Sequence, residues 1–207
     1  MSPGVRVEGG ALTDPFLAEP IPEEAALPHA LEVRLREFRA GRFYAKRALA
    51  KLGLPSCTIP IGPDRAPVWP AGITGSIAHT REICVAAAGP DSLFRAIGFD
   101  IEDDQPLPKE IVARVATPAE LGAREKDECP LGIDLPKLLF VAKEAFYKMW
   151  FPVTGIFLEF HDVAVEVDPD GGSVLASPVG GSGFDTMAGR FGRCDGMIFC
   201  YFDLPAD

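Results

Sequence analysis

The sequence has little positive charge and no long hydrophobic run. Its 207 residues include 20 lysine and arginine residues against 30 acidic ones, which gives a formal net charge of −10. Because so acidic a chain attracts polyanions poorly, we expect it to bind neither nucleic acid nor an anionic membrane. No stretch approaches the roughly 20 apolar residues of a membrane span, and residues 1–11 lack the apolar centre of a secretory signal. The expected location is therefore the cytoplasm.

Cysteine is also scarce. The five cysteines are odd in number and their spacing matches no zinc pattern, so they are interpreted as ordinary thiols of a reducing compartment. The chain is 47% hydrophobic and 24% charged, which is typical of a globular protein, and its length fits one large domain or two small ones.

The pattern of apolar residues predicts an α+β protein. Residues 1–30 carry five prolines and are expected to be extended over the fold. Helices are expected at 31–52, within 106–123 and at 136–151, and strands at 83–88, 96–102, 155–160, 163–167, 173–176 and 197–202. Thr117 and Pro118 are expected to be an N-cap and a first helical residue, and Pro152 is expected to close the last helix. Because helix followed by strands occurs twice, we expect two related α/β lobes, an N-terminal one at 31–98 and a C-terminal one at 99–207, that form one compact unit.

The helix expected at 31–52 is unusually basic for so acidic a protein. It carries seven lysine and arginine residues against Glu32 and Glu37. Such a run is commonly a solvated helix face. Its concentration here favours an anionic ligand instead, with Arg34, Arg39 and Arg42 presented to one side.

The strand expected at 96–102 places two carboxylates together. Side chains alternate between the faces of a strand, so Asp100 and Glu102 point to one face. Two adjacent carboxylates repel each other unless a cation lies between them, and oxygen ligands of this kind suit Mg²⁺. A solvent-exposed strand end is the alternative interpretation of this spacing.

The helix expected at 136–151 carries Phe140, Glu144, Lys148 and Phe151 on one stripe, because residues four apart share a helix face. Taken alone, Glu144 and Lys148 are a surface ion pair, which contributes little to stability.

Residues 98–102 (GFDIE) and 140–148 (FVAKEAFYK) together resemble the two signature motifs of the 4′-phosphopantetheinyl transferases, G-x-D-x-E and [FW]-x-x-K-E-A-x-x-K. Residues 67–79 (PVWPAGITGSIAH) resemble the W-P-x-G-x-x-G-S-[IL]-x-H segment of the Sfp-type enzymes, in their EntD-like branch, and residues 37–53 resemble their basic helix. The resemblance covers roughly residues 31–165. It implies the two-lobed, pseudo-twofold, monomeric type, with the active site at the lobe interface.

The resemblance also implies a set of site residues. The metal ligands would be Asp100, Glu102 and Glu144, the coenzyme A ligands Arg34, Arg42, Arg65, Ser76, His79, Lys143 and Lys148, and the catalytic residues Glu144, Lys148 and Asp100. The metal would be Mg²⁺, with Mn²⁺ as an alternative. Ile61 and Ala78 depart from residues that relatives carry, a lysine and a hydroxyl residue.

The implied reaction is transfer of the 4′-phosphopantetheine arm of coenzyme A to a serine of an apo acyl or peptidyl carrier protein, with release of 3′,5′-ADP. Glu144 is the candidate base for the serine proton. Two alternatives stay open: a catalytically silent carrier-protein or nucleotide-binding module on the same fold, and another Mg²⁺-dependent phosphotransfer enzyme or nuclease.

The partner carrier is expected to dock on an apolar surface, because an enzyme this acidic does not attract an acidic carrier over long range. Apolar residues near a spacing of four follow the metal strand: Leu107, Ile111, Val115 and Leu121. Ordinary helix core is an equally good interpretation of that spacing, and the docking surface then lies elsewhere, for example at residues 124–134.

Overall fold

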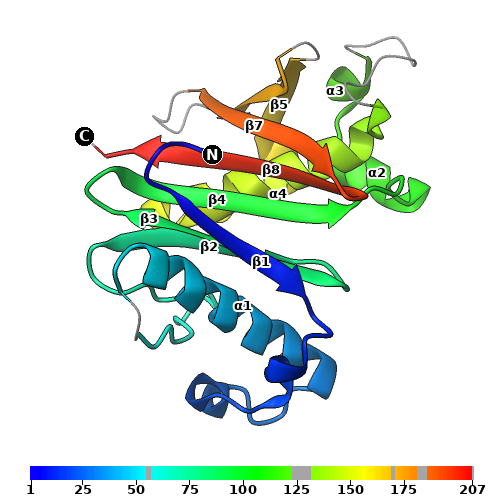
Figure 1. Cartoon of the computed structure of the whole chain (residues 1–207). Coiled ribbons are helices and arrows are strands. Elements are labelled where there is room, and N and C mark those ends of the chain that lie inside the picture. Colours follow the sequence, from blue (N-terminus) through cyan, green and yellow to red (C-terminus); the bar gives the residue numbers. More distant parts are fainter. Residues whose placement is uncertain (55–56, 123–131, 169–170, 181–185, 207) are drawn as a thin grey trace. The chain divides into compact units, whose positions relative to one another are not determined.

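The computed structural model describes residues 1–54, 57–122, 132–168, 171–180 and 186–206. The predicted α+β class is confirmed, with a three-stranded sheet of order β1-β3-β2 and a five-stranded sheet of order β4-β8-β7-β6-β5 (Figure 1). The chain divides into unit 1, Met1–Ile97 with Pro205–Asp207, and unit 2, Gly98–Leu204. No helix within the described ranges is both long and apolar enough to cross a bilayer.

The elements are β1 (Arg6–Ala11), the 3-10 turns η1 (Pro15–Ala18) and η2 (Pro22–Ala26), α1 (Glu32–Lys51), β2 (Ile73–His79), β3 (Ile83–Pro90), β4 (Phe94–Asp103), α2 (Lys109–Val115), α3 (Pro118–Gly122), α4 (Leu135–Thr154), the 3-10 turn η4 (Phe160–Asp162), β5 (Val163–Asp168), β6 (Ser173–Pro178), β7 (Met187–Cys194) and β8 (Met197–Pro205). Of the predicted strands, 155–160 is wrong, because residues 155–159 form a loop that leads into η4. The sequence pattern also missed β1, β2 and β7.

Unit 1 is built by α1 packing along the three-stranded sheet (Figure 1). Small buried side chains form the contact: Ala45 and Ala48 on the helix, Ala86 and Ala88 on β3. Short side chains let the helix lie close to the strands, which aligns α1 with β2 and β3. The first 30 residues were expected to be simply extended. They instead add β1 to the edge of the sheet, antiparallel to β3.

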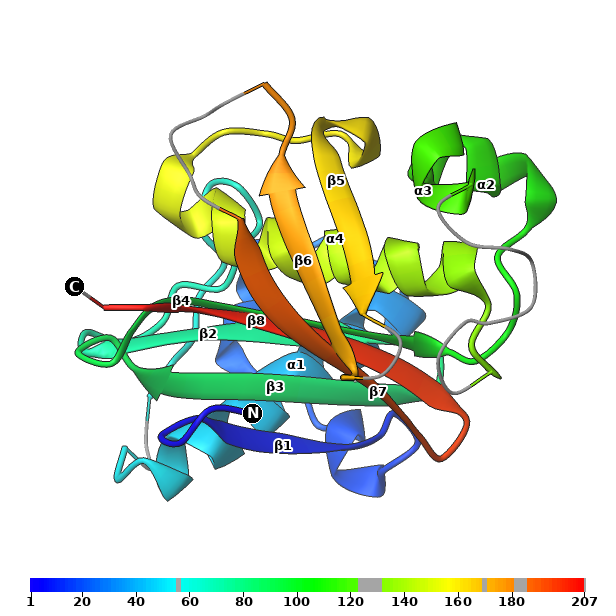
Figure 2. The same cartoon turned by 90° about the horizontal axis from the view of Figure 1, so that it is seen from above.

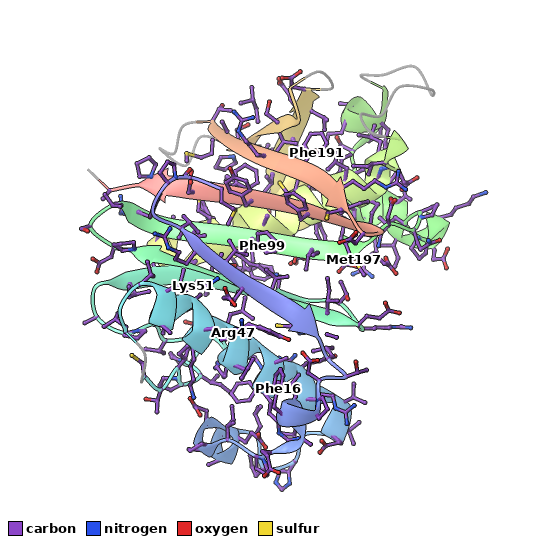
Figure 3. The ribbon with its side chains drawn as sticks, viewed as in Figure 1. Phe16, Arg47, Lys51, Phe99, Phe191 and Met197 are labelled. Atoms are coloured by element: carbon purple, nitrogen blue, oxygen red, sulfur yellow. The ribbon has the colours of Figure 1, made fainter. Side chains whose placement is uncertain are left out.

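Most of the basic residues of α1 are neutralised inside unit 1. Arg47 donates to Glu8 of β1 at 2.8 Å and Lys51 pairs with the other oxygen of the same carboxylate (Figure 3 labels both basic residues). Arg39 is 5% exposed and pairs with Glu24 and Glu32. The sequence suggested that Arg39 belongs to a ligand-facing side of the helix. It does not, because its guanidinium pairs with these two carboxylates and anchors the N-terminal segment.

Unit 2 is organised around α4, which runs across the five-stranded sheet (Figure 2). Phe146 packs edge-on against Phe202 of β8 and beside Trp150, with ring centroids 5.6 and 5.9 Å apart. The other side of β4 is also aromatic: Phe99, labelled in Figure 3, stacks on Phe199 of β8. Helix α4 is therefore a core element on one side and is available for chemistry on the other.

Helix α4 extends past the proline that was expected to close it. Pro152 lies in the last turn, where it removes one backbone hydrogen bond but does not break the helix. The helix ends at Gly155, whose φ of 65° lies in the left-handed region and whose N–H bonds to the Phe151 carbonyl at 2.9 Å.

Candidate functional site

The even-numbered residues of the second half of β4 face α4. An ideal Cβ on Gly98 would lie 2.6 Å from the Met149 backbone nitrogen and nearer still to the Ala145 carbonyl oxygen, so only glycine fits this position. Two residues on, the Lys148 Nζ of α4 donates to Asp100 Oδ1 at 2.6 Å. The glycine of the first motif thus brings the strand against the helix that carries the second motif.

Three carboxylates share the electrostatic environment of this face. Burial raises the pKa of Glu144, the Asp100 charge raises it further, and Lys148 opposes both. Burial likewise raises the pKa of Glu102, with Asp100 adding to the effect and Lys137 opposing it. Asp100 itself is only 5% exposed. Negative charge is therefore concentrated where water solvates it poorly.

This donor set fits a divalent cation by its chemistry and charge. Carboxylate oxygens are the ligands that Mg²⁺ takes in proteins, and a cation among three partly buried carboxylates would relieve their repulsion. As the side chains stand, no three His, Cys, Asp or Glu residues of the described part of the chain form a ready metal site. Two of the carboxylates have lysine ammonium groups nearby instead, Lys148 at 2.6 Å from Asp100 and Lys137 at 3.5 Å from Glu102.

A pocket of about 150 Å³ opens beside Glu144. It is lined by Lys143, Glu144, Tyr147, Phe157, Leu158, Glu159, Phe160 and Val163. The Tyr147 and Phe157 rings meet edge to face at 5.7 Å. One wall is therefore aromatic and another carries the carboxylate, which suits a narrow organic chain with a reacting group at its end.

Lys143 has a different setting from the one expected of a phosphate ligand. Its side chain is 1% exposed and pairs with Glu120 at 2.9 Å. Its Nζ also donates to the carbonyls of Val115 at 2.8 Å and Phe160 at 2.9 Å. An ammonium group has three N–H bonds, and all three are occupied here. Lys143 therefore acts as a buried structural residue in the wall of the pocket. No N–H of Lys143 is then left for a phosphate.

Sequence reasoning missed Glu120, which is the carboxylate partner of Lys143. Its carboxylate accepts from the Thr117 backbone at 2.7 Å and from the Val165 backbone at 3.0 Å, besides pairing with Lys143. Thr117 and Pro118 were predicted to start a helix and they do, in α3. The glutamate three residues after a threonine is the sequence sign of a capping box, so the signal was present.

Unit 1 carries a second candidate site, a basic pocket. Arg34, Arg42 and Arg65 line it together with Phe38 and residues 26–31 and 61–63, and its volume is about 610 Å³. Burial, with the Arg34 charge adding, lowers the pKa of Arg42 to about 10, so its guanidinium stays charged at neutral pH. Arg42 also donates to the Ile59 carbonyl at 2.6 Å and lies over the Phe38 ring.

His79 lies at the end of β2 and contacts Arg34 across 3.1 Å. Because arginine can only donate, the Nε2 atom of His79 accepts in this arrangement. Glu37 Oε2 lies 3.8 Å from the same nitrogen. Ser76, on the same strand, is 4% exposed. The structure thus brings Arg34, Arg42 and Arg65 to one pocket and adds His79 through its contact with Arg34.

The apolar residues expected to dock a carrier separate by burial. Leu107 is 8% exposed and Val115 is fully buried, whereas Ile111 is 38% exposed and Leu121 lies between these extremes. Most of the segment 124–134, the alternative docking region, lies outside the described residues. Only Ile111 of the set is a free surface side chain.

Comparison with known proteins gives two family matches and several close relatives. Residues 22–89 match the 4′-phosphopantetheinyl transferase N-terminal domain, and residues 96–186 match the 4′-phosphopantetheinyl transferase superfamily. The chain is 36% identical over 190 residues to the 4′-phosphopantetheinyl transferase Svp of Streptomyces mobaraensis, which covers 86% of this chain and 75% of Svp. It is 32% identical over 197 residues to the transferase PptT of Mycobacterium tuberculosis, covering 90% and 86%. It is 37% identical over 133 residues to enterobactin synthase component D of Escherichia coli K12, covering 62% and 60%.

Proposed function

Because this chain belongs to the 4′-phosphopantetheinyl transferase superfamily and is an enzyme that transfers 4′-phosphopantetheine to carrier proteins, we propose that Asp100, Glu102 and Glu144 hold its magnesium ion. The family uses coenzyme A and Mg²⁺. The observation that carries the proposal is the convergence of three partly buried carboxylates, two of them with a raised pKa, on the face where Lys148 meets Asp100.

The reaction joins the serine oxygen of the carrier to the β-phosphorus of coenzyme A and breaks the bridge between the two phosphates, so that 3′,5′-ADP leaves. Lys148 turns from Asp100 to the diphosphate and neutralises charge that develops there. Glu144 takes the serine proton, directly or through a water, because it lies beside both the proposed metal ligands and Lys148. Bound Mg²⁺ supplies further neutralisation of the phosphate oxygens.

The basic pocket of unit 1 is proposed to take the 3′-phosphate of coenzyme A. Arg34, Arg42 and Arg65 supply three cationic groups around one space. His79 holds Arg34 at 3.1 Å and adds an imidazole that can donate to a phosphate once protonated. Ser76 is kept as a candidate hydroxyl ligand from the same strand. The aromatic pocket beside Glu144 suits the pantetheine chain. Since one chain carries all these residues, we propose that the enzyme works as a monomer.

The test is a transfer assay. The protein is mixed with coenzyme A, Mg²⁺ and an apo carrier protein, and mass spectrometry follows the gain of one phosphopantetheine arm. Asp100→Asn, Glu102→Gln and Glu144→Gln should each lower the rate by roughly 100-fold or more, the scale of losing one group that stabilises transition-state charge, with unfolding curves that stay cooperative. Glu166→Gln, an exposed carboxylate on β5, is the matched control and should keep wild-type activity.

Full activity in two of the three site variants at high Mg²⁺ would remove these residues from the metal site. Absence of any mass gain with the wild-type protein and several carriers would favour the catalytically silent module. The identity of the physiological carrier is then a matter of which apo carrier gives the highest kcat/KM.

A further inference from the structure

We propose that Lys137 is a positioning residue that bridges Asp103 and Glu102 in the metal-free enzyme and keeps Asp103 alone when Glu102 turns to the metal. Lys137 is 6% exposed and its Nζ lies 2.7 Å from Asp103 Oδ1 and 3.5 Å from Glu102 Oε2. The inference rests on the proposed role of Glu102 as a metal ligand.

The position of Lys137 in its helix is the first unusual feature. Helix α4 begins at Leu135, so Lys137 is the third helical residue, and its backbone N–H bonds to the N-cap Asp134 at 3.1 Å. The first turn of a helix favours negative charge, because the backbone N–H groups there point outward unpaired. Within the described part of the chain, a buried lysine at this place is stabilised by the carboxylates of Asp103 and Glu102.

The two contacts of Lys137 differ in length, which suits the release of one carboxylate and the retention of the other. At 2.7 Å the bond to Asp103 is a full hydrogen bond, whereas 3.5 Å to Glu102 is at the limit of one. Glu102 can therefore leave while Lys137 keeps its main partner, and the weaker contact is the one that a metal ion must replace. The Asp103 side chain is 59% exposed and the Glu102 side chain is 29% exposed, so the stronger acceptor is also the better solvated one.

Lys137 and Lys148 act as counterions at the proposed metal site. Lys148 lies on Asp100 at 2.6 Å, and Lys137 is the corresponding ammonium for Glu102. Any divalent ion that binds these carboxylates competes with both lysines. The consequence is a lowered affinity for the metal alone, since part of the binding free energy is used to release an existing ion pair.

A second interpretation is that Lys137 only fastens α4 to β4. In that case its removal would lower stability, yet it would not change metal affinity in the direction that competition requires. The two interpretations are separated by measuring metal binding directly, without turnover.

The experiment titrates the protein with Mn²⁺ alone and follows free Mn²⁺ by electron paramagnetic resonance. Lys137→Met should tighten Mn²⁺ binding by roughly three- to tenfold, because a cation and a competing ion pair are removed. Lys137→Arg keeps the charge and should bind as the wild type does. Asp103→Asn should weaken binding, because of these two partners only Glu102 then offers Lys137 a negative charge.

The effect of removing any nearby negative charge on Mn²⁺ binding must be separated from the effect that passes through Lys137. Asp104→Asn is the matched control, because Asp104 is the next residue along and pairs with Arg193 instead. Asp103→Asn should weaken Mn²⁺ binding by about threefold more than Asp104→Asn does. In the Lys137→Met background this extra loss should disappear, which a double-mutant cycle measures.

Unchanged or weaker Mn²⁺ binding by a folded Lys137→Met variant would overturn the inference, as would an equal effect of Asp103→Asn in both backgrounds. If Lys137→Met fails to fold, the comparison of Asp103→Asn with Asp104→Asn decides, and equal losses reject the proposal. Glu102→Gln separates the proposed metal site from the proposed role of Lys137. If this variant binds Mn²⁺ as the wild type does, the proposed metal site is wrong. If it loses Mn²⁺ affinity while the Lys137 variants bind as the wild type does, only the role of Lys137 is rejected.

Discussion

The sharpest structural prediction concerns Gly98, the first residue of the G-x-D-x-E motif. In Gly98→Ala the new methyl group would lie 2.6 Å from the Met149 nitrogen and 2.8 Å from its Cβ, where ordinary contact begins at 3.4 Å. Strand β4 and helix α4 must therefore separate by on the order of 1 Å, because the obstacle is helix backbone and cannot rotate away. Overpacking of this kind costs about 1–3 kcal/mol of unfolding free energy.

The same displacement should reach the chemistry. Strand β4 carries Asp100, and α4 carries Glu144 and Lys148, so their separation changes the spacing of the groups proposed to act together. A misplacement of about 1 Å can lower a rate by about 100-fold. We therefore expect Gly98→Ala to lose both stability and transfer activity, with the loss of rate present at temperatures where the variant is fully folded.

The assay combines urea unfolding, read as a midpoint and a slope, with the transfer rate measured by mass spectrometry. Gly122→Ala is the matched control, because Gly122 ends α3 and an added Cβ there meets nothing within 4 Å. It should keep the wild-type rate and change the unfolding free energy by less than about 1 kcal/mol. Wild-type stability and rate in Gly98→Ala would refute the close-approach argument, and lost stability with a wild-type rate would show that this packing does not position the site.

Three further predictions follow from other contacts. His79→Ala should weaken binding of coenzyme A in calorimetry but leave dephospho-coenzyme A unaffected, and equal losses for both ligands would contradict a role at the 3′-phosphate. Ile111→Glu should raise the KM for the apo carrier without changing coenzyme A affinity, whereas Leu175→Glu, another exposed apolar residue, should change neither. Burial raises the pKa of Glu120 but Lys143 and Thr117 outweigh it, so the net pKa is lowered. Glu120 then stabilises the fold at neutral pH, and this contribution is lost as pH falls through its folded pKa. Glu120→Gln should flatten the acid limb of the pH–stability curve, and an unchanged limb would show that the pair contributes nothing.

The sequence by itself determined the elements that hold the motifs. Strand alternation put Asp100 and Glu102 on one face, and a spacing of four put Glu144 and Lys148 on one stripe of α4. These inferences succeed because they depend on neighbours within one turn or one strand. The start of α3 at Thr117 and Pro118 is of the same kind.

Only the tertiary structure decided which charged side chains form ion pairs within the protein and which remain available for a ligand. Arg39 and Arg42 are three residues apart on α1, yet the first anchors the N-terminal segment and the second lines the basic pocket. Lys143 belongs to the second motif, but its partners come from residues 115, 120 and 160. The physical reason is that an ion pair depends on the distance between two side chains, and only folding sets that distance for residues far apart in the chain.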